Sequence, residues 1–122
     1  MEKLVTVAEI DPFDATARRA GLTEDERTEL VDFLAANPEK GDLMPGTGGL
    51  RKLRWRKGGR GKRSGYRAIY YFFSDDMPIY LMAIYAKNQR TDLSPEQRRQ
   101  LSALAEDLKA SARAAMAKRS IR

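Results

Sequence analysis

The 122-residue sequence contains no cysteine and no histidine. Without cysteine there can be no disulfide, no thiolate nucleophile and no cysteine-based zinc site. Without histidine there can be neither a histidine general base nor a histidine metal ligand. Any catalysis must therefore use lysine, arginine, tyrosine, carboxylate or backbone groups. We expect no metal site and no cofactor.

Long apolar runs are missing as well. No stretch approaches the roughly 20 apolar residues that a membrane-spanning helix needs. The first ten residues carry two acids within a short apolar run, which is unlike a signal peptide. We therefore expect a cytoplasmic protein without a membrane partner. The length and the 42% apolar content are typical of one folded domain, residues 1–122. Its last ~6 residues are expected to fray.

Acidic residues are absent from residues 43–74, whereas nine of the 23 lysines and arginines lie there. The rest of the chain carries more acids than bases, although the net charge is +6. Such a dense cationic segment costs self-repulsion, and a polyanion is the usual compensating partner. We therefore predict that this segment binds the phosphates of a nucleic acid. The candidate RNA-binding residues are Arg51, Arg56, Lys57, Arg60, Lys62 and Arg63, with Asn88 and Arg90 following the last predicted strand.

Residue periodicity and helix-capping signals predict an α+β fold in the order β-α-α-β-β-β-α. Three consecutive strands with local connections favour an antiparallel meander, covered on one face by the two N-terminal helices and followed by a C-terminal helix. The predicted elements are a strand over 4–10, a helix over 11–20 capped by Asp11 and stopped by Gly21, a helix from the Thr23 capping box to Asn37, strands over 50–56, 66–73 and 79–86, and a helix from Ser94 to about Met116.

The strand over 50–56 alternates with period two. Leu53 and Trp55 share one face, and Lys52, Arg54 and Arg56 share the other. This pattern predicts a strand with an apolar back and a row of cations on its front. Because neighbouring strands of a meander lie side by side, Arg67 at the start of the next strand and Lys87 after the last are expected to converge on this row.

Three segments together resemble the RelE toxin superfamily, most closely its HigB branch. They are GTGGLRKLRW at 46–55, GYRAIYY at 65–71 and IYAKNQRTDLS at 84–94. The similarity spans roughly residues 31–108, and its fold agrees with the one predicted above. The resemblance implies a type II toxin that cleaves messenger RNA in the ribosomal A site by attack of a 2′-hydroxyl. It also implies a monomer on its own and a hetero-oligomer with a cognate, HigA-like antitoxin.

The resemblance also assigns roles to individual residues. Arg54 and Arg67 match arginines beside the scissile phosphate, and Lys52 matches a lysine proposed to help activate the 2′-hydroxyl. Lys87 matches a cationic position after the last strand. The charged forks of two arginines suit the oxygens of a pentacovalent phosphorane.

One family feature is missing. Several RelE proteins have a tyrosine where this chain has Ser94, within the predicted cap of the last helix. The nearest tyrosine by sequence is Tyr85, which we include among the candidate catalytic residues. A core aromatic of the last strand is an equally good interpretation of Tyr85. The residue types leave open which group is the general base and which the general acid.

Two other functions fit the same pattern. ParE toxins share the fold but act on DNA gyrase, and they generally lack so dense a set of cations. A non-catalytic RNA- or DNA-binding module would need aromatics that stack on bases among the cations. Only Trp55 and Tyr66 could serve in that way, and Trp55 is predicted on the opposite face of its strand.

Overall fold

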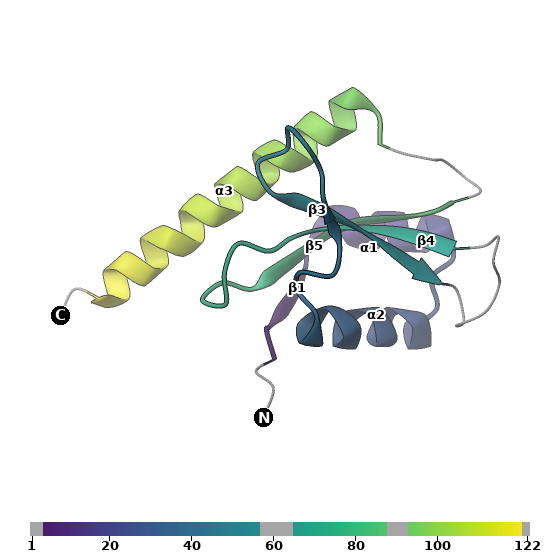
Figure 1. Cartoon of the computed structure of the whole chain (residues 1–122), viewed down its shortest axis with the longest axis horizontal. Coiled ribbons are helices and arrows are strands. Elements are labelled where there is room, and N and C mark those ends of the chain that lie inside the picture. Colours follow the sequence, from purple (N-terminus) through teal and green to yellow (C-terminus); the bar gives the residue numbers. More distant parts are fainter. Residues whose placement is uncertain (1–3, 57–64, 88–92, 121–122) are drawn as a thin grey trace.

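The computed structural model describes residues 4–56, 65–87 and 93–120. Within them the chain forms an α+β fold, in which helices lie on both sides of a five-stranded sheet (Figure 1). The predicted element order is confirmed, with one short strand added. The elements are β1 (Val7–Glu9), α1 (Asp11–Ala20), α2 (Glu24–Ala36), β2 (Asp42–Leu43), β3 (Leu50–Arg56), β4 (Gly65–Tyr71), β5 (Ile79–Ala86) and α3 (Pro95–Ser120).

The strands are arranged in the order β1-β5-β4-β3-β2. Strands β3, β4 and β5 form the predicted antiparallel meander. Two features are additions that the sequence did not predict: β1 pairs with β5 in parallel, and the two-residue β2 pairs with the outer side of β3. The parallel pairing places α1, which follows β1 directly, beside β5.

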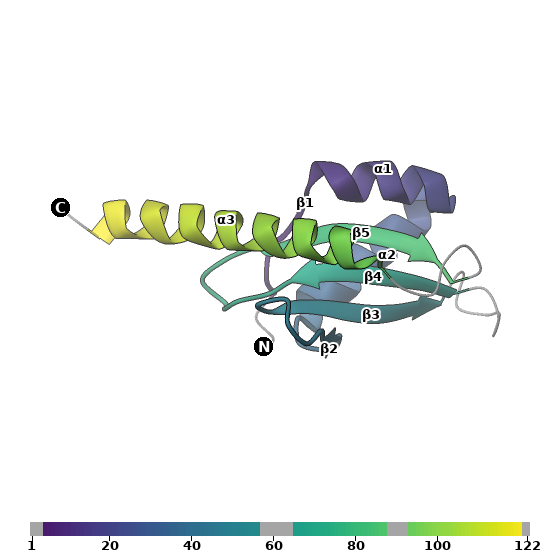
Figure 2. The same cartoon turned by 90° about the horizontal axis from the view of Figure 1, so that it is seen from above.

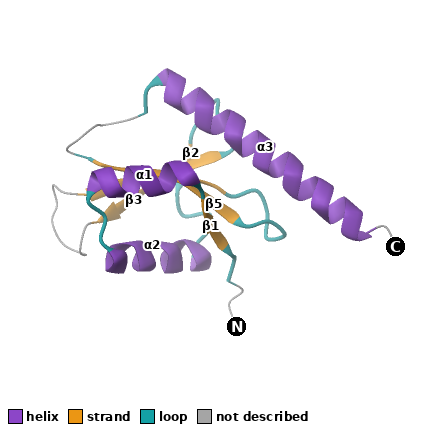
Figure 3. Cartoon of the chain, turned by 180° about the vertical axis from the view of Figure 1, so that it is seen from behind, coloured by secondary structure: helices purple, strands orange, loops and turns teal. Residues whose placement is uncertain are grey.

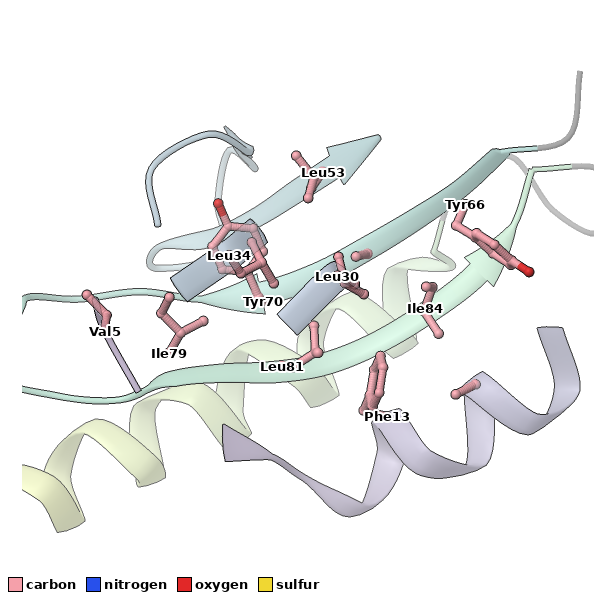
Figure 4. Close-up of a cluster of buried hydrophobic side chains, with 12 residues drawn as sticks. Val5, Phe13, Leu30, Leu34, Leu53, Tyr66, Tyr70, Ile79, Leu81 and Ile84 are labelled. Atoms are coloured by element: carbon pink, nitrogen blue, oxygen red, sulfur yellow. The ribbon is translucent and has the colours of Figure 1, made fainter. Parts of the chain in front are cut away.

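Helices α1 and α2 cover one face of the sheet, as predicted. Phe13 of α1 and Leu30 and Leu34 of α2 are fully buried against residues such as Leu53 and Ile84 of the sheet (Figure 4). Seen from behind the view of Figure 1, α1 lies in front of the sheet (Figure 3). Complete burial of a large apolar side chain stabilises a fold by about 1.5–3 kcal/mol. This cluster is therefore the main core of the domain.

Helix α3 packs on the opposite face, where Leu101 and Ala105 contact a second cluster that includes Ile69 and Tyr71. Its C-terminal half extends past the turn between β4 and β5 (Figures 1 and 2). The helix reaches Ser120, beyond the end at about Met116 that the weakening apolar pattern predicted. No helix in the described part of the chain is both long enough and apolar enough to cross a membrane.

The capping boxes that open α2 and α3 are confirmed. The Thr23 hydroxyl accepts from the N–H of Glu26, whose carboxylate accepts from the N–H of Thr23. The predicted cap of α1 is wrong, because Ile10 rather than Asp11 is its N-cap. The N–H of Ile10 donates to Leu81 O of β5 (3.2 Å), so this residue stays extended as the N-cap and the helix already begins at Asp11.

A β-bulge interrupts the alternation of β5. Ile69 pairs with Ala83 but Tyr70 pairs with Leu81, so Met82 is an extra residue in β5. Met82 and Ala83 consequently both belong to the cluster under α3. A bulge of this kind reverses which face the following residues occupy. Tyr85 therefore faces α3, whereas an unbroken alternation from Leu81 would turn it toward α1 and α2.

Candidate functional site

Three candidate residues form one row across the sheet, on the face that carries α3. Arg54 of β3 pairs directly with Arg67 of β4, which pairs with Tyr85 of β5. Side chains in directly opposed positions have Cβ atoms about 4.5–5.5 Å apart. Like charges in such a pair are destabilising. An anion bound between the two guanidinium groups would remove that cost, so the row is suited to a phosphate.

Two lysines flank this row. Lys52 lies two residues before Arg54 on β3 and is half-buried. The N–H of Lys87 donates to Gly65 O (2.9 Å), so the pairing of β4 with β5 continues to this residue. The two-residue period of a strand places Lys87 on the same face as Tyr85. The exposed Lys87 and the half-buried Lys52 therefore bracket the row from two strands.

The exposure of the side chains in the row falls from β3 to β5. Arg54 is exposed, Arg67 is half-buried and Tyr85 is only 7% exposed. Nη1 of Arg67 makes a long hydrogen bond to Tyr66 O (3.4 Å), and it lies 3.8 Å from where a Cβ at Gly65 would stand. A long bond of this length constrains a side chain weakly. Arg67 can therefore turn toward a ligand without losing a strong bond.

Some predicted RNA-binding residues do not join this row. Arg51 lies on the other face of β3, where its Nη1 donates to Glu39 O (3.1 Å) and Gly41 O (2.8 Å). Its side chain thus ties β3 to the preceding loop. Arg56 ends β3 opposite Gly65. The remaining predicted RNA-binding residues lie outside the described parts of the chain: Lys57, Arg60, Lys62, Arg63, Asn88 and Arg90.

Residues 8–120 match the protein family described as the RelE toxin of the RelE/RelB toxin-antitoxin system. The match covers every helix and nearly the whole sheet. The chain belongs to the RelE toxin family. It is accordingly a toxin of a toxin-antitoxin system, and RelE toxins pair with an antitoxin.

Ser94, which the sequence resemblance aligned with a tyrosine of several RelE proteins, is a structural cap in this RelE-family toxin. Ser94 Oγ accepts from the N–H of Gln97 (3.1 Å), and Gln97 Oε1 accepts from the N–H of Ser94 (3.0 Å). The hydroxyl of Ser94 is therefore engaged at the start of α3. Tyr85 lies in the cross-strand row, but its ring is part of the cluster beneath α3.

Another tyrosine supports the site from the far side of the sheet. Tyr66 precedes Arg67, is 1% exposed, and donates from its hydroxyl to Glu26 Oε1 (3.3 Å). Burial, with a smaller contribution from the Glu26 carboxylate, raises the pKa of Tyr66 to about 12. Tyr66 therefore stays protonated near neutral pH and fixes this end of β4 to α2. It cannot serve as the stacking aromatic that a nucleic-acid-binding module would need.

The structure also brings together residues that the sequence did not single out. Helix α1, the open edge of β5 and the first turns of α3 enclose a cavity of about 380 Å³ beside Tyr85. Arg19 of α1 and Gln100 of α3 line it. Residues so far apart in the chain carry no shared motif. The one signal in the sequence was the start of a helix soon after the last strand, which indicated that α3 folds back near β5.

Proposed function

We propose that this RelE-family toxin is a metal-independent endoribonuclease of the HigB branch, which cleaves messenger RNA in the ribosomal A site and so inhibits translation. The observation that carries the proposal is the cross-strand row of Arg54, Arg67 and Tyr85, with Lys52 and Lys87 beside it. Together the row and the two lysines bring cations of β3, β4 and the residue after β5 to the face that α1 and α2 leave uncovered. A HigA-like antitoxin is the proposed partner that keeps the activity in check.

The chemistry assigned to the row is an intramolecular transesterification. A base removes the proton of a 2′-hydroxyl, the oxygen attacks the adjacent phosphorus, and a pentacovalent phosphorane forms. The bond to the 5′-oxygen then breaks, that oxygen takes up a proton, and a 2′,3′-cyclic phosphate remains. Arg54 and Arg67 stabilise the negative charge that develops on the phosphorane oxygens. Lys52 helps to activate the 2′-hydroxyl, and Lys87 holds a flanking phosphate.

The proposal includes dependence on the ribosome. The row has an exposed end at Arg54 and a buried end at Tyr85, and it offers no histidine. A site of this kind gains much of its rate from a strand that is already held in an orientation ready for attack. The ribosome supplies such a strand in its A site. Purified toxin is therefore expected to cut messenger RNA far faster with ribosomes than without them.

The proposal is tested by mapping RNA 5′ ends after brief induction of the toxin. Cuts inside translated codons are the expected result. Intact messenger RNA accompanied by gyrase-linked DNA breaks would refute the proposal and favour a ParE-like activity instead. Equal cleavage of naked and ribosome-bound RNA by the purified protein would remove the ribosome from the mechanism.

Substitutions in the row and at Lys52 distinguish residues that act through their positive charge from a residue that transfers a proton. Arg54→Ala or Arg67→Ala should slow cleavage by about 10²–10³-fold, as expected for losing one donor to a developing oxyanion. Lys118→Ala is the matched control, because it removes one exposed charge at the projecting end of α3. Lys52→Arg keeps the positive charge but cannot release a proton near neutral pH. It should abolish cleavage while RNA binding survives. Near-normal cleavage by Lys52→Arg would reduce Lys52 to an electrostatic role.

A further inference from the structure

The cavity next to Tyr85 is bounded by three elements from different parts of the chain. Helix α1 contributes Pro12 and Arg19, β5 contributes Tyr85, and α3 contributes Leu101 and Gln100. Its volume of about 380 Å³ lies within the range of about 300–1,000 Å³ that is typical of small-molecule sites. The cavity is therefore large enough to hold a small planar ligand.

Hydrogen bonds fix two of the cavity walls. The Thr16 hydroxyl accepts from the N–H of Ile84 (3.0 Å), which locks α1 to the open edge of β5. The side chain of Gln97 is held by its bond to the N–H of Ser94 at the start of α3. Both Thr16 and Gln97 line the cavity. Its width is thus set by bonds between backbone and side chain, so a ligand would meet a preformed site.

The cavity lies directly next to the row of Arg54, Arg67 and Tyr85. Tyr85 is at once the third residue of the row and part of the cavity wall. Adjacent strands lie about 4.8 Å apart, so the backbone of Arg67 is one strand away and that of Arg54 is two strands away. A phosphate held by the two arginines would therefore have its attached nucleoside beside the cavity.

The chemistry of the lining suits a nucleobase. Pro12, Leu93 and Leu101 offer apolar surfaces to the faces of a ring, while Arg19 and Gln100 are exposed polar residues. Arginine pairs with O6 and N7 of guanine, and glutamine pairs with N6 and N7 of adenine. None of the described residues that line the cavity is acidic, so these residues do not repel the phosphate of a nucleotide. Gln100 Nε2 makes only a 3.5 Å bond to Glu96, which costs little to exchange for a base.

We propose that this cavity is a subsite for a purine base of one of the two nucleotides that flank the scissile phosphate. Arg19 and Gln100 are its specificity-determining residues, and the apolar walls hold the ring. The inference rests on the proposed ribonuclease function. In this arrangement residues of α1 and α3 select the base, whereas the row of cations binds the phosphate of any nucleotide.

The direct test is a titration of the purified protein with each of the four 5′-nucleoside monophosphates, followed by backbone NMR. AMP and GMP should shift the amide signals of Ala83, Tyr85 and Leu101, and should bind at least fivefold more tightly than CMP and UMP. Equal shifts with all four nucleotides, confined to Arg54 and Arg67, would overturn the inference, because they would report phosphate binding alone. The absence of any binding in the cavity would overturn it too.

Two exposed positions allow substitution without disturbing the core. Gln100→Leu should weaken AMP binding, and Arg19→Met should weaken GMP binding, each by roughly five- to tenfold. Arg18→Met is the matched control, because Arg18 is on the same helix, is 81% exposed and does not line the cavity. If Arg18→Met weakens binding as much as Arg19→Met, the assignment of Arg19 is wrong.

Mapping of cut sites separates this inference from the proposed function. An active nuclease whose cuts show a purine beside the cleaved bond, with that bias lost in Gln100→Leu, supports both. An active nuclease with no purine bias in either protein overturns the subsite and leaves the ribonuclease intact. Purine-selective shifts at the cavity in a protein that cuts no RNA would support the subsite and refute the ribonuclease.

Discussion

The bond between Thr16 and Ile84 can be tested by one substitution of nearly constant shape. β1 pairs with β5 only at residues 79–81, so the N–H of Ile84 is bonded not by a strand but by Thr16 Oγ1 of α1 (3.0 Å). Thr16→Val retains the β-branched shape and removes this acceptor. Ile84 is 1% exposed, and leaving a buried N–H without an acceptor costs about 1–3 kcal/mol. We expect Thr16→Val to lower the free energy of unfolding by that amount.

The same chemical change at an exposed site is the control. Thr28 lies on the solvent side of α2, so Thr28→Val should change the free energy of unfolding by no more than about 0.5 kcal/mol. Unfolding in urea can be followed by the fluorescence of Trp55, the only tryptophan, whose ring centre lies 5.1 Å from that of Phe33. Exchange of the Ile84 amide hydrogen reports the bond itself. If the two valine variants unfold alike and Ile84 stays protected in both, the bond does not hold the edge of β5.

Two further predictions concern ionisation and backbone conformation. Because the pKa of Tyr66 is raised from 10.0 to about 12, folding favours its protonated form, and this stability is present below pH 10. It is lost as the pH rises, by about 2 kcal/mol at pH 12. Alkaline urea titrations should show this loss reduced in Tyr66→Phe, and an equal loss in both proteins would contradict the assignment. Gly49→Ala should destabilise the fold by more than Gly46→Ala in thermal melts. Both glycines have positive φ, but only at Gly49 would a Cβ lie 2.9 Å from the ring of Tyr71. Equal melting temperatures would show that the ring moves aside.

The part of the site on β3 was predictable because a local pattern determines it. The two-residue period separates Lys52 and Arg54 from Leu53, and the structure shows Leu53 in the core beneath α1 and α2. Helix caps such as that of Thr23 were predictable for the same reason, since the bonds join residues close in sequence. The assignment of the strands to a meander also predicted that Arg67 lies near Arg54, whereas the register that pairs them directly came from the structure.

The remainder depended on contacts between distant parts of the chain. Parallel pairing of β1 with β5 has no local signature, and it is this pairing that brings α1 beside the cavity. The bulge at Met82 has no signature in the sequence either. A strand that is buried on both faces is apolar throughout, so it shows no alternation of apolar and polar residues that a bulge could interrupt. In the sequence, Arg51 looks like one more cation of a basic strand. Only the structure shows that it binds the carbonyls of the preceding loop.

The bulge in β5 also compensates for one extra residue in the strand. Side chains beyond Met82 occupy the face opposite to the one that a regular strand would give them. Regular pairing of the same residues, without the bulge, would turn Tyr85 and Lys87 toward α1 and α2, away from Arg54 and Arg67. Deleting Met82 would also make the pairing regular, but it would leave Tyr85 paired with Arg67 on the face of α3, because Leu81 and Ala83 keep their partners Tyr70 and Ile69. Among relatives, β5 should therefore either keep the extra residue together with the bulge or lack both.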